Sequence, residues 1–296
     1  MVALEQLRYA RLVTDDLGPA ADFAQRVLGL ELIDRNQELA TFRSDFRDYT
    51  LAFETGDHAV RSVGLEVRYS DDLDAALEGL RRLGLSAGRG TADDCARRKV
   101  KDMVWFTDFS GNRIELVVRP LNSGWRYFPS RDAGIRGLSG VVLRSTDIEK
   151  DLSIWSGIFG AQVSDWAGDA AYLRFDDAHH RIALFPAARP GILAVEYAVE
   201  DVNLLMRNHY VLQDLQVAVL HGPGRRPASE QIFLTFAGPS DTHFSFVVEG
   251  PPVEEGKRPA RQFPAGPMGL CNWGSECKIG EFGGASNGRN GSSARV

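Results

Sequence analysis

The sequence predicts an α+β protein in which two tandem modules each contain paired βαβββ units that form an open, cup-like sheet. An internal repeat is the first observation: residues 7–17 match residues 138–148, and the shift between the copies stays within one residue as far as 113–117 and 243–247. The second observation is that both copies show the same order of strand and helix patterns. The third is that 296 residues, 44% of them apolar, are enough for each copy to bury a core. A repeat this steady indicates duplication of a whole module.

Each copy opens with a strand that leads into a helix. The strands at 7–13 and 138–144 are rich in aliphatic residues and end at Asp or Thr-Asp, which can cap a following helix. Gly29 and Gly160 close these helices, since a helix end commonly needs a residue with positive φ. Apolar side chains recur at helical spacing, as Ala20, Phe23, Val27 and Leu28 in the first copy and Leu152, Trp155, Ile158 and Phe159 in the second.

Further strands and a second helix complete the paired unit. Three strands are predicted after each first helix, and a fourth strand then leads into second helices around 72–83 and 200–208. A connector at 120–129 that contains Pro and Gly separates the copies. The predicted division is an N-terminal module over 1–125, a C-terminal module over 126–252 and a tail over 253–296. The last part of this tail, 283–293, is too small and polar to fold alone.

Composition argues against several classes of function. The formal charge is −6 and no long block of Lys or Arg occurs, so no nucleic-acid partner is expected. No run approaches the roughly 20 apolar residues of a membrane span, and the N-terminus lacks a basic segment followed by an apolar one. We therefore expect a cytoplasmic protein without membrane contact. Three cysteines, an odd number, fit a reducing compartment, and Cys271 and Cys277 are interpreted as ordinary thiols of the tail.

Particular motifs carry a resemblance to a known family. The segment 108–116 reads Asp-Phe-Ser-Gly-Asn-Arg-Ile-Glu-Leu, the second copy opens with Leu-x-x-Val-Val-Leu, and the linker contains Gly-Trp-Arg-Tyr-Phe-Pro at 124–129. Over about residues 5 to 250 the chain resembles the vicinal oxygen chelate superfamily of glyoxalases, bleomycin-resistance proteins and extradiol dioxygenases. The tandem copies and the linker are most similar to the two-module type I extradiol dioxygenases. The resemblance implies a homo-oligomer that acts on an aromatic small molecule.

The same resemblance implies an iron site in the C-terminal module. Relatives hold Fe(II), sometimes Mn(II), through two His and one Glu on three inward-facing strands. At the matching positions this chain has Gly140, Ala194 and Ser245. None of these three is a strong metal ligand, so we expect no metal and no other cofactor. The corresponding positions of the N-terminal module hold Tyr9, Ser62 and Glu115, and one carboxylate does not hold iron.

Titratable side chains remain at other cup positions. An acid/base His of the family maps to His180, and a further family His maps to Arg226 or Ala228. Because side chains alternate along a strand, Glu196 should share the face of position 194, and His243 that of Ser245. A buried His beside a carboxylate is a plausible acid/base pair. The predicted catalytic residues are His180, Glu196 and His243, and the predicted substrate-binding residues are Arg144, Tyr197, Arg226 and Ser245.

A glycine-rich segment lies near these positions. Residues 221–226 read His-Gly-Pro-Gly-Arg-Arg, which lacks the Lys-Ser/Thr ending and the following helix of a phosphate loop. We interpret the segment as a hairpin or an active-site loop, whose two Arg could bind an acidic substrate.

Three hypotheses for function stay open at this point. The first is a metal-independent enzyme that acts by acid/base chemistry on an aromatic or polyketide-like small molecule in the C-terminal cup. The second is a true Fe(II) extradiol catechol dioxygenase with a displaced metal site. The third is a non-catalytic small-molecule binder or partner subunit. Fold resemblance does not decide among them, because one fold can carry several functions.

Overall fold

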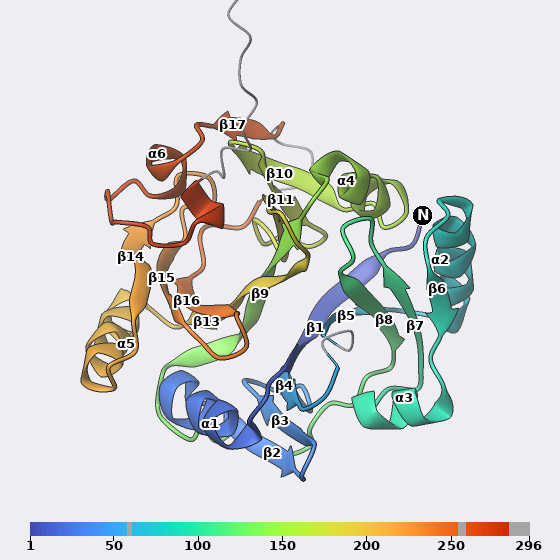
Figure 1. The fold of residues 1–296 in the computed structure, drawn as a ribbon, viewed down its shortest axis with the longest axis horizontal. Coiled ribbons are helices and arrows are strands. Elements are labelled where there is room, and N and C mark those ends of the chain that lie inside the picture. Colours follow the sequence, from blue (N-terminus) through green and yellow to red (C-terminus); the bar gives the residue numbers. More distant parts are fainter. Residues whose placement is uncertain (58–60, 254–258, 284–296) are drawn as a thin grey trace, which may run out of the picture.

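A computed structural model describes residues 1–57, 61–253 and 259–283. The first module is built on an eight-stranded sheet in the order β2-β3-β4-β1-β5-β8-β7-β6 (Figure 1). Its strands are β1 (Leu4–Val13), β2 (Glu31–Arg35), β3 (Leu39–Arg43), β4 (Leu51–Glu54), β5 (Ser62–Val67), β6 (Ala87–Arg89), β7 (Asp102–Thr107) and β8 (Arg113–Val118). Its helices are α1 (Leu17–Asp22), the π-helical η1 (Phe23–Leu28), α2 (Ser70–Arg82) and α3 (Ala92–Arg98).

The second module repeats this plan on a nine-stranded sheet in the order β14-β15-β16-β13-β9-β12-β11-β10-β17. Its strands are β9 (Ile135–Ser145), β10 (Gln162–Ala167), β11 (Ala170–Arg174), β12 (Ile182–Pro186), β13 (Gly191–Val199), β14 (Val219–Arg225), β15 (Ile232–Ala237), β16 (His243–Val248) and β17 (Arg261–Phe263). Its helices are α4 (Ile148–Gly157), α5 (Val202–Asp214), α6 (Pro267–Leu270) and the 3-10 helix η3 (Glu281–Gly283). No helix within the described ranges is long and apolar enough to cross a membrane.

The predicted α+β fold of paired βαβββ units is confirmed. In each module the two units join through a central antiparallel pair, β1 with β5 and β9 with β13. The predicted helix ends also hold: Gly29 and Gly160 have φ of 84° and 66°. Asp16 and Asp147 cap α1 and α4 by accepting hydrogen bonds from the backbone N–H groups of Gly18 and Lys150.

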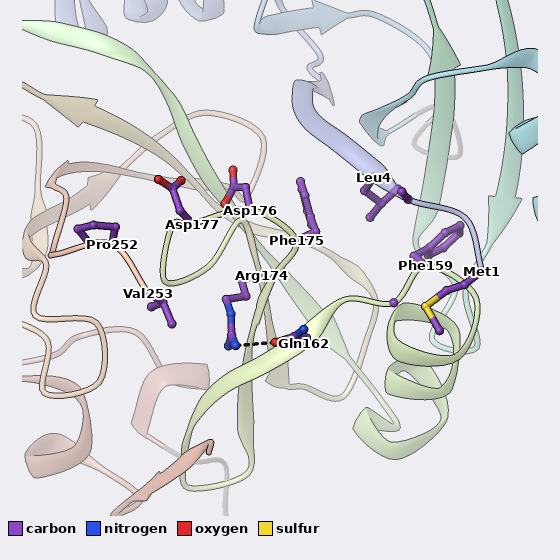
Figure 2. Close-up of a pocket in the computed structure, with 12 residues that line it drawn as sticks. Met1, Leu4, Phe159, Gln162, Arg174, Phe175, Asp176, Asp177, Pro252 and Val253 are labelled. Carbon is purple, nitrogen blue, oxygen red and sulfur yellow. Dashed lines mark hydrogen bonds between the residues drawn. The ribbon is translucent and has the colours of Figure 1, made fainter. Parts of the chain in front are cut away.

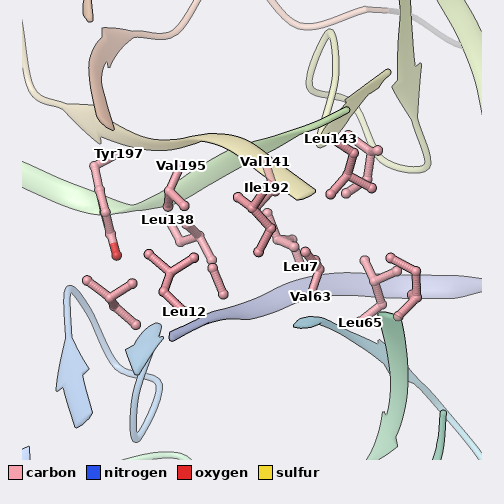
Figure 3. Close-up of a cluster of buried hydrophobic side chains, with 14 of the residues drawn as sticks. Leu7, Leu12, Val63, Leu65, Leu138, Val141, Leu143, Ile192, Val195 and Tyr197 are labelled. Carbon is pink, nitrogen blue, oxygen red and sulfur yellow. The ribbon is translucent and has the colours of Figure 1, made fainter. Parts of the chain in front are cut away.

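One core joins the two modules. Leu7 and Leu65 from the first sheet face Val141 and Ile192 from the second, and all four side chains are at most 2% exposed (Figure 3). The opposite faces of β9 and β13 are therefore left to line the C-terminal cup, because side chains alternate across a strand.

The tail contributes to the second module. β17 pairs in parallel with β10, and the segment that contains α6 and η3 lies beside β14 (Figure 1). Two main-chain hydrogen bonds hold the segment there, from Asn272 N–H to Arg225 O and from Lys278 N–H to Leu220 O, both 2.8 Å. Residues 259–283 are therefore integrated into the C-terminal fold. The polar stretch predicted to stay unfolded lies, from residue 284 onward, outside the described residues.

A buried ion pair fills the N-terminal cup. The Glu115 carboxylate is fully buried and accepts two hydrogen bonds from the Arg98 guanidinium of α3, at 2.7 and 2.6 Å, and one from the Tyr9 hydroxyl at 2.9 Å. Burial on its own would raise the pKa of Glu115, but the hydrogen bonds and charge of Arg98 outweigh it and keep the pKa below its usual range. Both carboxylate oxygens of Glu115 therefore already accept hydrogen bonds from protein side chains.

Candidate active site in the C-terminal cup

Glycine at position 140 leaves space for a carboxylate in the cup. A Cβ atom built on Gly140 would lie 3.1 Å from Oε2 of Glu196. Glu196 therefore points to the cup face of β13, while Val195 and Tyr197 point to the inter-module core (Figure 3). The strand alternation that predicted the orientation of Glu196 is consistent with this geometry.

Glu196 links a histidine and an arginine. Its Oε2 lies 3.3 Å from Nε2 of His180, and its Oε1 accepts a 2.5 Å hydrogen bond from Nη2 of Arg226. All three residues are at most 7% exposed. Nη1 of Arg226 donates to Gln231 Oε1 at 2.7 Å, which fixes the plane of the guanidinium. The structure thus brings together His180, Glu196 and Arg226.

A second histidine extends the chain of hydrogen bonds. Nδ1 of His179 lies 3.0 Å from Nδ1 of His180, and Nε2 of His179 lies 2.9 Å from Oδ2 of Asp165. Arg261 of the tail donates to the same Asp165 oxygen at 2.7 Å. The two imidazoles thus connect Glu196 to Asp165 through three contacts.

Burial and charge act in opposite directions on the two acid/base groups. Burial lowers the pKa of His180, and the hydrogen bond to Glu196 only partly opposes it. Burial would raise the pKa of Glu196, but the charge of Arg226 and the hydrogen bond of His180 outweigh it and hold the pKa far below its ordinary value. At neutral pH the cup therefore contains an ionised Glu196 between a neutral His180 and the Arg226 cation.

His243 lies apart from this pair. In the parallel register of β13 and β16, His243 is opposite Ala194, whereas Glu196 is opposite Ser245, two residues or about 6.6 Å further along. Burial and then the charge of Arg144 lower the pKa of His243, and Glu281 of the tail partly opposes them. The predicted trio of His180, Glu196 and His243 thus separates into a pair within the cup and a single residue near Arg144.

The predicted substrate-binding residues have different surroundings. Ser245 is buried and its hydroxyl lies 2.8 Å from that of Thr235. Tyr197 does not line the cup: it lies in the inter-module core, on the opposite face of β13 from Glu196 (Figure 3). The prediction for Tyr197 was therefore wrong, because a residue directly after Glu196 must point to the other face of the strand.

Tail residues close the cup. The remaining cavity measures about 10 Å³, which is room for one water molecule at most. Leu270 and Phe282 of the tail form one side of this cavity, and the rest of its lining comes from Val142, Tyr172, Phe185, His221 and Arg226. Displacement of the tail is therefore required before a larger molecule can enter.

His221 is the histidine in this lining, and the sequence analysis did not select it as a site residue. It is 3% exposed, and its Nε2 has no hydrogen-bond partner among the described residues. Burial, followed by the charge of Arg226, lowers its pKa to about 4, so the ring is neutral at pH 7. The interpretation of 221–226 as an active-site loop was the one signal that pointed to His221. It was not sufficient, because the position of His221 depends on the bulged pairing of β14 with β15.

A larger cavity of about 760 Å³ lies outside the cup, between the N-terminus and β10 and β11 (Figure 2). Met1, Leu4 and Phe159 give it an apolar side, and Asp176 and Asp177 line the other. Its Arg174 donates hydrogen bonds to Ser164 and Gln162, at 2.9 and 2.6 Å, so this cation already has partners. The buried pair of His180 and Glu196 lies in the cup instead.

Comparisons with known proteins agree with this architecture. Residues 6–116 match the model of the Glyoxalase/Bleomycin resistance protein/Dioxygenase superfamily. An iron-dependent extradiol dioxygenase from Rhodococcus jostii is 26% identical, over 94% of this chain and 99% of the relative. A 3-methylcatechol 2,3-dioxygenase from Pseudomonas putida is also 26% identical, over 84% and 89%. The chain is thus similar to two-module proteins of the extradiol dioxygenase type within this superfamily.

Solved structures show the same fold for this chain. A halotolerant catechol dioxygenase superposes with a TM-score of 0.84 at 20% identity, covering 93% of this chain and 95% of the other. A Mn(II)-bound glyoxalase from Novosphingobium aromaticivorans also gives 0.84, at 22% identity and with 94% and 93% covered. At these identities the likeness establishes the fold alone. The chemistry of the cup has to be inferred from the residues of this chain.

The residues that the structure describes do not fit an iron site in the observed arrangement. The described ranges contain no group of three or more His, Cys, Asp or Glu side chains placed to hold a metal ion. Both oxygens of Glu196 already contact His180 and Arg226, and both ring nitrogens of His180 have partners. A guanidinium 2.5 Å from the only carboxylate of this trio also repels a divalent cation.

Replacement of His221 by glutamine should flatten the dependence of stability on pH. The unfolded chain protonates this residue near pH 6.5 and the folded protein only near pH 4, so His221 progressively lowers the stability as pH falls between these values. Urea unfolding at pH 7, 5.5 and 4.5 should show a steeper loss for wild type than for the variant, by at most about 1.4 kcal/mol per pH unit. His209→Gln on α5 is the matched control, and equal slopes for wild type and His221→Gln would contradict the burial of a neutral His221.

Proposed function

We propose that the C-terminal cup binds an aromatic or polyketide-like small molecule and performs acid/base chemistry on it without a metal. The observation that carries this proposal is the shared lining of one cavity by the neutral His221 and the cationic Arg226, in a cup whose metal-ligand positions hold Gly140, Ala194 and Ser245. Relatives with this fold include enzymes named for catechol substrates, which supports an aromatic ligand.

His221 is the base in this proposal. Its unprotonated ring nitrogen can accept a proton from an acidic O–H or C–H group, and the burial that lowers its pKa keeps it ready to do so at pH 7. Arg226 stabilises the anion that remains on the ligand, since this cation lines the same cavity. A ligand anion also offsets the charge of Arg226 that disfavours protonated His221.

His180 and Glu196 act as positioning residues. They act on the ligand indirectly, by positioning Arg226. Its guanidinium is fixed by the 2.5 Å bond to Glu196 and the 2.7 Å bond to Gln231. Tyr172 and Phe185 supply aromatic surface, because both line the cavity and their rings pack edge to face at 5.9 Å.

An iron-dependent extradiol dioxygenase is the second candidate. The similarity that favours it is the 26% identity to the iron-dependent enzyme over nearly the whole of both chains. It requires the hydrogen bonds of Glu196 to be rearranged so that His180, Glu196 and His243 converge on a metal, with the second nitrogen of each imidazole oriented by its own partner.

Benzoylacetone, an aromatic 1,3-diketone, tests the proposal. Chelator-treated protein should bind it as the enolate at pH 7, as measured by ultraviolet difference spectra, and His221→Gln should reduce the bound enolate by about tenfold or more. His209→Gln is the matched control and should behave as wild type. Oxygen consumption with catechol that appears only after addition of Fe(II) would favour the dioxygenase instead, and an enolate yield that is unchanged in His221→Gln would remove His221 as the base.

A further inference from the structure

The tail places a carboxylate and an aromatic ring from adjacent residues inside the cup. Glu281 and Phe282 belong to η3, and the side chain of Glu281 is 26% exposed while Phe282 is 6% exposed. The pairing of β17 with β10 ends at Phe263, so it does not determine where Glu281 and Phe282 lie. The two side chains occupy the cup as one small acidic and aromatic unit.

Arg144 holds the carboxylate. Its Nε donates to Oε1 of Glu281 at 2.8 Å, which is its shortest hydrogen bond. Its other nitrogens reach the carbonyl oxygens of Ile192 and Asp241 at 3.3 Å and the half-exposed Asp241 carboxylate only at 3.5 Å. The Arg144 side chain is 2% exposed. A buried guanidinium requires a hydrogen-bonded anion, so removal of Glu281 leaves a subsite that favours another carboxylate.

Phe282 fills the aromatic part of the cup. Its ring lies 4.7 Å from the ring of Phe185 and 6.3 Å from that of His221. Phe185 is the register partner of Arg144 on the neighbouring parallel strand, so the backbones that carry the ring subsite and the cation are one strand spacing apart, about 4.8 Å. A ligand that fills both subsites therefore needs its carboxylate within a few atoms of its ring.

We propose that the C-terminal cup takes an aromatic carboxylate, and that Glu281 and Phe282 occupy its two subsites in the absence of ligand. The proposal rests on the proposed function of the same cup and names the class of its ligand. Arg144 binds the carboxylate, Phe185 packs against the ring, and the ring then lies beside His221. The tail segment acts as an internal competitor that leaves when ligand enters.

Few contacts retain the end of the tail. The contacts that involve residues 278–282 include the Lys278 N–H bond to Leu220 O, the Glu281–Arg144 ion pair and the packing of Phe282 and Ile279. The His221–Cys277 bridge precedes them and marks the point where the segment can separate from β14. Displacement therefore leaves α6 and the Asn272 bond to Arg225 in place.

Calorimetric titration of 3-phenylpropionate and of its neutral analogue 3-phenylpropanamide tests the proposal. Glu281→Gln should bind the carboxylate at least about tenfold more tightly than wild type, because the competing charge on Arg144 is gone. Phe282→Ala should increase the affinity for both compounds, because it vacates the ring subsite. Arg144→Met in the Glu281→Gln background should abolish the preference for the carboxylate over the amide. Glu276→Gln, an exposed residue of the same tail, is the charge-matched control and should bind as wild type does.

The outcomes separate the two proposals. If Glu281→Gln binds carboxylate and amide equally well, the aromatic cup stands and the carboxylate class is wrong. Equal affinity of wild type and Glu281→Gln for the carboxylate overturns the assignment of Glu281 as competitor. If neither compound binds any variant, including Phe282→Ala, the aromatic-carboxylate class is wrong, and the enolate yield with benzoylacetone decides separately whether the proposed function stands. The Glu281→Gln and Phe282→Ala comparisons decide the question even if Arg144→Met does not fold.

Discussion

Glu196→Leu is expected to lower the free energy of unfolding by about 3–5 kcal/mol, because it leaves the Arg226 cation buried without its carboxylate. Arg226 is 7% exposed, and its remaining side-chain partner, Gln231, is neutral. His180 also loses the acceptor of its Nε2 proton, although its pKa is already lowered by burial. Urea unfolding at pH 7 measures the effect.

A double-mutant cycle separates the ion pair from the packing of its side chains. Arg226→Met alone should cost a similar amount, since it leaves the Glu196 carboxylate buried. Glu196→Leu with Arg226→Met should be much closer to wild type than the sum of the single variants, because two apolar side chains of similar volume replace the pair. Strict additivity of the two single effects would show that Glu196 and Arg226 do not interact as the structure has them. Loss of benzoylacetone enolate in the stable double variant would assign the pair to binding rather than to stability.

Glu115→Leu should have an equally large effect in the other module. The substitution leaves the Arg98 guanidinium, 6% exposed, without the carboxylate that accepts two of its hydrogen bonds, so we expect a loss of about 3–5 kcal/mol. Arg98→Met combined with Glu115→Leu should restore most of this stability.

The Glu115 prediction differs from the first in its effect on ligand binding. The N-terminal cluster lies in the first sheet and the proposed ligand site in the second, so Glu115→Leu should leave the affinity for 3-phenylpropionate within about twofold of that of wild type, measured well below the unfolding transition. A large loss of affinity in a folded Glu115→Leu protein would contradict a purely structural role of this ion pair.

The fold could be predicted from the sequence because its signals are local and occur twice. Gly29 and Gly160, and the capping residues Asp16 and Asp147, each determine the end of an element by short-range geometry. The repeat of the same signals identified the paired βαβββ units without any knowledge of tertiary contacts.

The site could be predicted only where strand alternation determines it. Glu196 followed from the cup orientation of position 194, and the same rule argues against Tyr197, which directly follows it. The pairing of His180 with Glu196 could be predicted in the same way. The hydrogen bond from Arg226 to Glu196 could not, because it depends on how the segment after β14 folds back over the cup. Register shifts in β14 also decide the direction of His221, and sequence periodicity does not reveal them.

The tail was the larger omission. Leu270, Ile279 and Phe282 are widely spaced apolar residues in a Gly- and Pro-containing segment, and they show neither helical nor strand periodicity. Their burial follows from tertiary contacts with Phe185 and the other apolar side chains of the cup. A segment of this kind can be recognised as part of the site only when the cup it fills is known.

The measurement that tests the central claim most directly is the iron content of the purified protein after anaerobic incubation with excess Fe(II) and removal of unbound metal. Because Gly140, Ala194 and Ser245 provide no strong ligand and Arg226 occupies the Glu196 carboxylate, we expect iron far below one equivalent per chain, and the same content in Glu196→Leu as in wild type. Iron near one equivalent per chain, lost on substitution of His180, Glu196 or His243, would contradict metal-independent chemistry in this cup and establish a displaced metal site.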